Sequence, residues 1–159
     1  VVIEVNLSPG LKGIMAATKQ NVPKSVAEFL HKKTSEYKVV GKQKGYEVYE
    51  MDQSFLDFND EEFDFIWCRH CLEHSIFPYF TLAELFRVLK RKGDLYVEVP
   101  APDTVGNHHS NKNHYSVLGK SMWVELIKRS GFNILDIMNI PVQLKIGPDL
   151  YWAFVQQKP

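Results

Sequence analysis

Two oxygen-bearing side chains open the chain. Glu4 and Asn6 stand two residues apart in the apolar run VVIEVN. Because side chains alternate along a strand, both would project from the same face of a strand formed there. Carboxylate and amide oxygens are hard ligands of the kind that Mg²⁺ prefers. The pair therefore predicts either magnesium ligands or the start of a cofactor-binding loop, and the two alternatives imply different enzymes.

A histidine pair in the middle of the chain allows metal chemistry. His70 and His74 fit the H-x-x-E-H pattern, in which both histidines bind zinc and Glu73 is the base of a metalloprotease. That mechanism needs both histidines on one face of a helix. His70 directly follows the apolar stretch FDFIWC, so we expect it to precede any helix and disfavour zinc proteolysis.

A second group of histidines lies in the stretch NHHSNKNHYS, which contains His108, His109 and His114. A metal site is one interpretation of this group. Asn-rich stretches of this kind are typical of exposed loops, and a surface loop is the other interpretation.

Composition narrows the function classes. The chain has 159 residues, 45% of them hydrophobic, with nineteen Lys and Arg balancing nineteen Asp and Glu. This size fits one domain or pieces of two, and the balanced charge argues against binding to nucleic acid or to a membrane surface. Cys68 and Cys71 are too few for a disulfide scaffold, so we expect reduced thiols and a cytoplasmic protein. Composition does not predict an oligomeric state.

Strand and helix patterns alternate along the chain, which favours an α/β fold with a mostly parallel sheet. Gly93 and Gly131 are expected to end the second and third helices. The expected strands are 1–6, 46–52, 63–70, 94–100, 133–140 and 149–157, and the expected helices are 23–34, 80–93 and 120–132.

From about residue 45 onward, three stretches in order resemble the second half of a class I S-adenosylmethionine (SAM)-dependent methyltransferase. They are GYEVYEMDQSFLDFNDEEFDFIWCRHCLEH, LAELFRVLKRKGDLYVEVP and NHYSVLGKSMWVELIKRSGFNIL. The resemblance implies an incomplete Rossmann-like, mostly parallel sheet with helices on both faces. It also implies SAM as cofactor and a small-molecule, sugar-like or peptidic methyl acceptor.

The resemblance also implies roles for single residues at the carboxyl ends of strands, where such sheets bind ligands. His114 would be a general base facing the acceptor, and a surface-loop histidine is the alternative. Asp52 could instead be a turn residue, His74 a packed or capping histidine, and Cys68 a small buried side chain. The implied cofactor contacts are Asp52, Phe55, Cys68, Arg69, His70 and His74.

The glycine-rich cofactor loop of that family is not found upstream of Asp52. Aligned with it, the opening stretch puts Glu4 at the acid and only Gly10 at one of the three glycine positions, the others being Asn6 and Ser8. The cofactor affinity and the activity are therefore expected to be low or absent, and a non-catalytic remnant or interaction module is an alternative.

The other interpretation is that IEVNLSPGLKGIMAAT and NVPKSVAEFL resemble the carboxyl-terminal end of ATP-grasp ligases of the glutamate-ligase branch. This resemblance implies Glu4 and Asn6 as ligands of Mg-ATP, provided that a complete ATP-grasp domain is present. The expected organisation is an ATP-grasp-like segment at 1–35, a linker or seam at 36–44 and a methyltransferase-like domain at 45–159. A fragment of a carboxylate–amine ligase is accordingly an alternative function.

Overall fold

The computed structural model describes residues 2–5, 49 and 51–159. The chain forms two compact units, residues 1–7 with 53–159 and residues 8–52. The expected helix at 23–34 and the expected linker at 36–44 lie outside the described residues, as does Asn6. Only the backbone of residues 2–5 is described, so the side chain of Glu4 is not placed.

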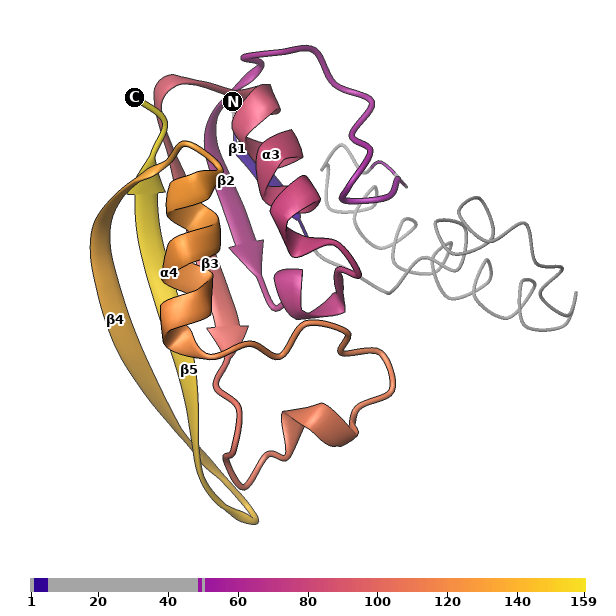
Figure 1. Ribbon diagram of the computed structural model, residues 1–159, viewed down its shortest axis with the longest axis vertical. Coiled ribbons are helices and arrows are strands. Elements are labelled where there is room, and N and C mark those ends of the chain that lie inside the picture. The colour runs from indigo at the N-terminus through magenta and orange to yellow at the C-terminus, as the bar shows by residue number, and fades with distance from the viewer. Residues whose placement is uncertain (1, 6–48, 50) are drawn as a thin grey trace, which may run out of the picture. The chain divides into compact units, whose positions relative to one another are not determined.

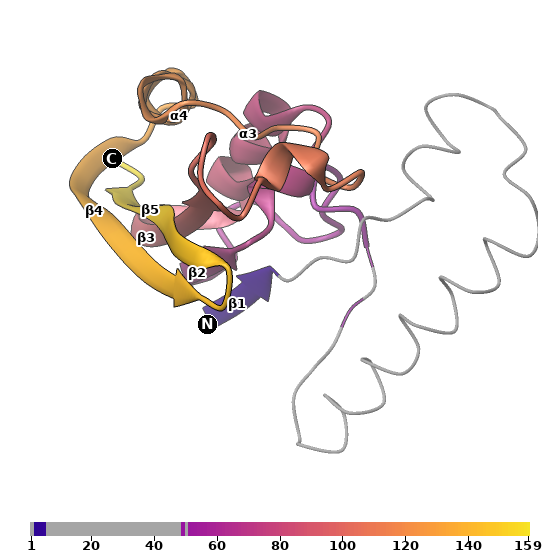
Figure 2. The ribbon, with the colours of Figure 1, turned by 90° about the horizontal axis from the view of Figure 1, so that it is seen from below.

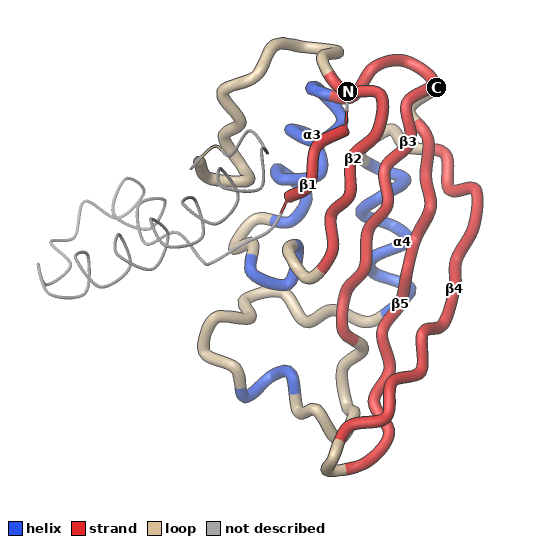
Figure 3. Tube along the Cα trace, turned by 180° about the vertical axis from the view of Figure 1, so that it is seen from behind, coloured by secondary structure: helices blue, strands red, loops and turns tan. Residues whose placement is uncertain are grey.

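Five strands form one sheet in the described part of the chain, in the order β1-β2-β3-β5-β4 (Figures 1 and 3). The strands are β1 (Val2–Val5), β2 (Phe63–Arg69), β3 (Leu89–Pro100), β4 (Asn133–Leu144) and β5 (Gly147–Gln157).

Strand directions confirm the expected α/β class. β2 pairs parallel with both β1 and β3, whereas β5 pairs antiparallel with both β3 and β4. β5 is therefore the one described strand that runs against the others, and the sheet is mostly parallel. The opening apolar run supplies the edge strand β1, as its pattern predicted.

Helices α3 (Pro78–Val88) and α4 (Lys120–Arg129) cover the same face of the sheet (Figures 1 and 2). Leu82 and Leu85 of α3 lie about one turn apart and are fully buried, as are Trp123 and Ile127 of α4. This spacing gives each helix one apolar stripe toward the sheet. No helix in the described ranges is long and apolar enough to cross a membrane.

The prediction that Gly93 ends the second helix is wrong. α3 ends at Val88, and Leu89 already has an extended backbone with φ −80° and ψ 135°. Leu89 is fully buried and pairs with Phe63 of β2. This pairing places Leu89 in strand β3 and not in the helix. Gly93 lies inside β3, where an added Cβ would come within 2.9 Å of the Leu89 Cγ atom. The glycine is needed for close packing within β3.

The carboxyl-terminal elements follow the expected pattern. α4 is followed by Gly131, which has φ +97° and donates its backbone N–H to the Lys128 carbonyl at 3.0 Å. A positive φ of this size favours glycine, which explains the turn into β4. The expected strand at 46–52 is not seen at its described residues 49, 51 and 52, none of which is in a strand.

We predict that Leu85→Ala lowers the free energy of unfolding by about 2–5 kcal/mol, because it leaves a cavity between α3 and the sheet. Urea denaturation of the purified chain measures the change. The matched control is Leu135→Ala on β4, where the leucine is 58% exposed and the expected loss is below about 1 kcal/mol. Equal losses in the two variants would contradict this placement of the core.

Candidate functional site

The carboxyl ends of three parallel strands meet at one edge of the sheet. Val5 of β1 pairs with Cys68 of β2, which pairs with Val97 of β3. One residue further on, Arg69 is opposite Glu98. In open α/β sheets ligands bind beyond this edge. The segments that leave β2 and β3 here therefore form the candidate site.

Glu98 organises the polar side chains of this edge. Its side chain is only 6% exposed, and its carboxylate accepts hydrogen bonds from Arg69 Nε at 2.9 Å, His70 Nε2 at 2.8 Å and the Tyr96 hydroxyl at 2.7 Å. Burial opposes ionisation of this carboxyl, but the bond from Tyr96 and the Arg69 charge outweigh burial and lower its pKa. Glu98 is thus an ionised acceptor that holds three side chains in place.

Aromatic and imidazole rings form a continuous row along the edge. The His70 ring stacks on the Tyr151 ring, with centroids 4.7 Å apart. The Tyr151 and His108 rings form a T-shaped contact with centroids 5.4 Å apart. The His108 ring stacks on the His114 ring with centroids 5.8 Å apart. The His114 and His74 rings form a T-shaped contact with centroids 4.7 Å apart. Burial lowers the pKa of both His70 and His114, so both rings favour the neutral form.

A buried acid orients the middle of this ring row. The Asp149 side chain has no exposed surface, and its Oδ2 atom accepts a hydrogen bond from His108 Nε2 at 3.0 Å. The neutral His108 ring then carries its lone pair on Nδ1. Gly106 lies against this pair: a Cβ there would be 2.6 Å from Asp149 Oδ2. A residue without a side chain is therefore required beside the pair.

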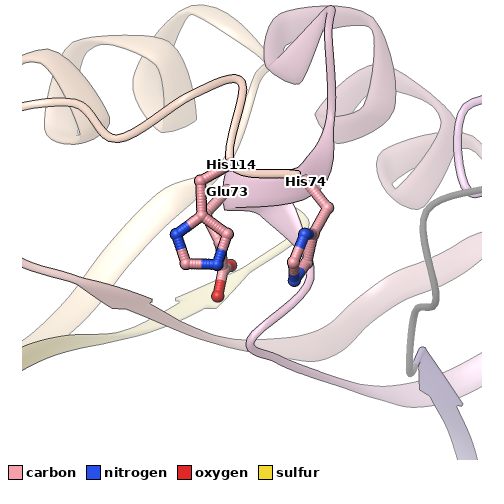
Figure 4. Close-up of side chains that lie close together, drawn as sticks. All are labelled: Glu73, His74 and His114. Carbon is pink, nitrogen blue, oxygen red and sulfur yellow. The ribbon is translucent and has the colours of Figure 1, made fainter. Parts of the chain in front are cut away.

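Glu73, His74 and His114 lie at the other end of the row, and Figure 4 shows their side chains converging from two segments of the chain. One ligand atom from each lies within 4.8 Å of the other two. Glu73 is 2% exposed, and burial raises its pKa to about 7. Within the described part of the chain, neither Glu73 Oε2 nor His114 Nδ1 has a hydrogen-bond partner.

The structure brings together four of the residues that the sequence singled out. Arg69, His70, His74 and His114 all border the edge beyond β2 and β3. Their proposed contacts with a cofactor or acceptor remain predictions.

The other candidates are buried, exposed or not placed, and their roles stay predictions. Cys68 is buried within β2 at 1% exposure, and Phe55 is 67% exposed, with its ring 5.3 Å from that of Phe80. Asp52 belongs to the unit formed by residues 8–52, whose position relative to the sheet is not defined. Asn6 lies outside the described residues.

The geometry of an H-x-x-E-H protease is not present. His70 has φ +53°, precedes the short 3₁₀ turn η1 (Leu72–His74) and is bound by Glu98. His70 and His74 therefore do not share one face of a helix. His74 instead lies beside His114, forty positions along the chain.

Sequence reasoning missed the two acids that orient histidines. Glu98 is a lone charge in the apolar run LYVEVP, and Asp149 is followed by the apolar run LYWAFV. An isolated acid in an otherwise buried strand is a usable signal, because burying a charge is costly unless it is paired. The pattern does not reveal which histidine each acid binds.

Comparisons with known proteins agree with this architecture. The model of the family described as "Methyltransferase domain" matches residues 3–97. No curated protein matches the chain. Solved structures match at the level of the fold. A SAM-dependent methyltransferase from Methanosarcina mazei has TM-score 0.59 and 18% identity over 71% of this chain and 67% of its own.

Two further structures resemble the chain. The [4+2]-cyclase SpnF has TM-score 0.62 and 17% identity over 76% of this chain and 60% of its own. The 1,6-didemethyltoxoflavin-N1-methyltransferase of Burkholderia thailandensis, solved with 1,6-didemethyltoxoflavin and S-adenosylhomocysteine, has TM-score 0.61 and 20% identity over 77% and 56%. The chain thus spans less than two thirds of these two proteins, and identities this low show the fold alone.

We predict that the Glu98 carboxylate makes stability depend on acid pH. Because the folded pKa is lowered, its contribution is present above the unfolded value of about 4.3 and is lost as the pH falls through the folded pKa. Melting temperatures from pH 7 to pH 3 should fall less steeply in Glu98→Gln than in the unsubstituted chain. Glu125→Gln, at a half-exposed site on α4, is the control. A slope unchanged by Glu98→Gln would contradict the assignment.

Proposed function

Because the chain belongs to the methyltransferase domain family, whose model matches residues 3–97, we propose that it transfers a methyl group from SAM to a small molecule. The observation that carries this proposal is the gathering of ordered polar side chains at the carboxyl edge of the matched parallel strands. The name of the Burkholderia enzyme likewise describes the methylation of a small molecule.

The described edge offers groups suited to such a cofactor. SAM supplies an already activated methyl group, so the protein has mainly to orient the reactants and to exclude water. The cofactor ends in an α-amino acid whose carboxylate needs a cationic partner. Arg69 is half exposed and fixed by Glu98, and we propose it for this role beside His70. Asp52, Phe55, Cys68 and His74 remain sequence-based proposals for the same site.

The methyl acceptor must also lose a proton. We propose His108 as the group that accepts it, because the buried Asp149 carboxylate fixes its tautomer and would stabilise the imidazolium that forms. His114, the base that the sequence suggested, stacks on His108 and remains the alternative.

The ATP-grasp interpretation gains no support from these comparisons. The family match begins at residue 3 and so includes β1 and most of the 1–35 segment. Glu4 and Asn6 as ligands of Mg-ATP stay a prediction from sequence. The non-catalytic alternative is separated from methyl transfer by the binding experiment below.

We predict that calorimetric titration with S-adenosylhomocysteine gives saturable heat. Arg69→Gln should weaken the affinity by about 10-fold, the value of one charge-assisted hydrogen bond. Arg129→Gln on α4, where the arginine side chain is 69% exposed, should leave it unchanged. Absence of heat at millimolar ligand would reject the proposal and favour the non-catalytic remnant.

A second prediction concerns the proton acceptor. With an acceptor found by screening small phenols and amines against a labelled methyl donor, His108→Gln should lower kcat by about 10²–10⁴-fold. The affinity for S-adenosylhomocysteine should stay the same, because His108 acts on the acceptor. A larger kcat loss in His114→Gln than in His108→Gln would transfer the role of base to His114.

A further inference from the structure

Beyond methyl transfer, the geometry points to a binding site for a divalent transition-metal ion formed by Glu73, His74 and His114 (Figure 4). One carboxylate and two imidazoles form a donor set that suits Zn²⁺, Co²⁺ and Fe²⁺ rather than Mg²⁺ or Ca²⁺. The ligands differ from those of the H-x-x-E-H pattern, because His114 takes the place of His70 and Glu73 is a ligand instead of a base.

Glu73 brings to the donor group a buried oxygen that has no hydrogen-bond partner among the described residues. Glu73 is 2% exposed, yet its Oε2 atom has no partner in the described part of the chain, and the same is true of the buried Nδ1 atom of His114. A buried polar atom without a partner costs about 1–3 kcal/mol, and more for a charged group. A cation bound among the three residues would satisfy the Glu73 oxygen.

The third donor is already oriented for a metal. His74 Nδ1 donates a hydrogen bond to the main-chain carbonyl of Asn113 at 2.9 Å. The lone pair of the neutral ring is therefore on Nε2. Metal-binding histidines commonly donate their second ring N–H to a carbonyl in this way, which fixes the tautomer and the ring plane.

Hydrogen bonds between the two segments hold the donors together. The Glu73 carbonyl accepts the backbone N–H groups of Tyr115 and Ser116 at 2.8 and 3.0 Å. The Ser116 hydroxyl donates to the Ser75 carbonyl at 2.6 Å. The loop that carries His114 is thereby attached to the turn at Glu73 and at Ser75, the two residues on either side of His74.

The size of the group fits an ion after a small contraction. The ligand atoms lie within 4.8 Å of one another, whereas donors bonded to a tetrahedral Zn²⁺ at about 2.0–2.1 Å lie about 3.4 Å apart. The ligand atoms therefore have to approach one another by at most about 1.4 Å when an ion binds. Three protein ligands leave one coordination position for water or another small ligand, as in catalytic zinc sites.

Metal binding is tested without cofactor or acceptor, so its result is independent of the proposed methyl transfer. The untagged full chain, stripped with a chelator and dialysed, is titrated with ZnCl₂ by calorimetry and with CoCl₂ by visible absorption. We expect one equivalent to bind, with the intense cobalt bands of a four-coordinate site. The ion should also raise the melting temperature through linkage.

Each of Glu73→Gln, His74→Gln and His114→Gln should lose more than about 10-fold in affinity, the lower range for removing even an outer-shell partner of a metal site. His109→Gln is the control, because this half-exposed histidine lies in the same loop but outside the donor group. His74→Gln changes a partly exposed side chain and tests the site even if the Glu73 variant does not fold. Absence of saturable binding, retention of affinity in the ligand variants, or an equal loss in His109→Gln would each overturn the inference.

Discussion

The candidate site depends on one backbone interaction, in which the Glu73 carbonyl accepts the N–H groups of Tyr115 and Ser116. It connects the loop that follows β3 to the turn that follows β2. Together with the bond from His74 Nδ1 to the Asn113 carbonyl, it keeps His114 beside His74. The Ser116 hydroxyl adds a bond to the Ser75 carbonyl at 2.6 Å, so main-chain and side-chain donors together hold the two segments.

Three buried acids at this edge have different surroundings. Glu98 is ionised because Tyr96, Arg69 and His70 supply donors. Burial opposes ionisation of Asp149, but the Thr104 side chain, the backbone N–H of Leu150 and His108 together lower its pKa. Glu73 is buried with fewer donors, so its pKa is raised. One sheet edge thus holds two acids that orient histidines and one whose charge needs a further partner.

The expected elements were right where the hydrophobic pattern and the turn residues agreed. β2 is an almost continuous apolar run, and Gly131 has the positive φ that ends α4. Near Gly93 two requirements competed: the helical stripe continued through Leu89, but pairing with Phe63 of β2 placed that leucine in the sheet. Helix propensity is a weak preference that such tertiary pairing overrides.

The sequence by itself determined the alternation of elements, the buried face of each helix and the presence of polar residues directly after β2, because periodicity and turn chemistry are local. Tertiary structure alone decided which of the six histidines meet. His74 contacts the His114 ring, and His108 binds Asp149 forty-one residues away. These contacts depend on the strand register and on how the loop after β3 folds back onto the turn after β2. Neither is set by contacts between neighbours in the chain.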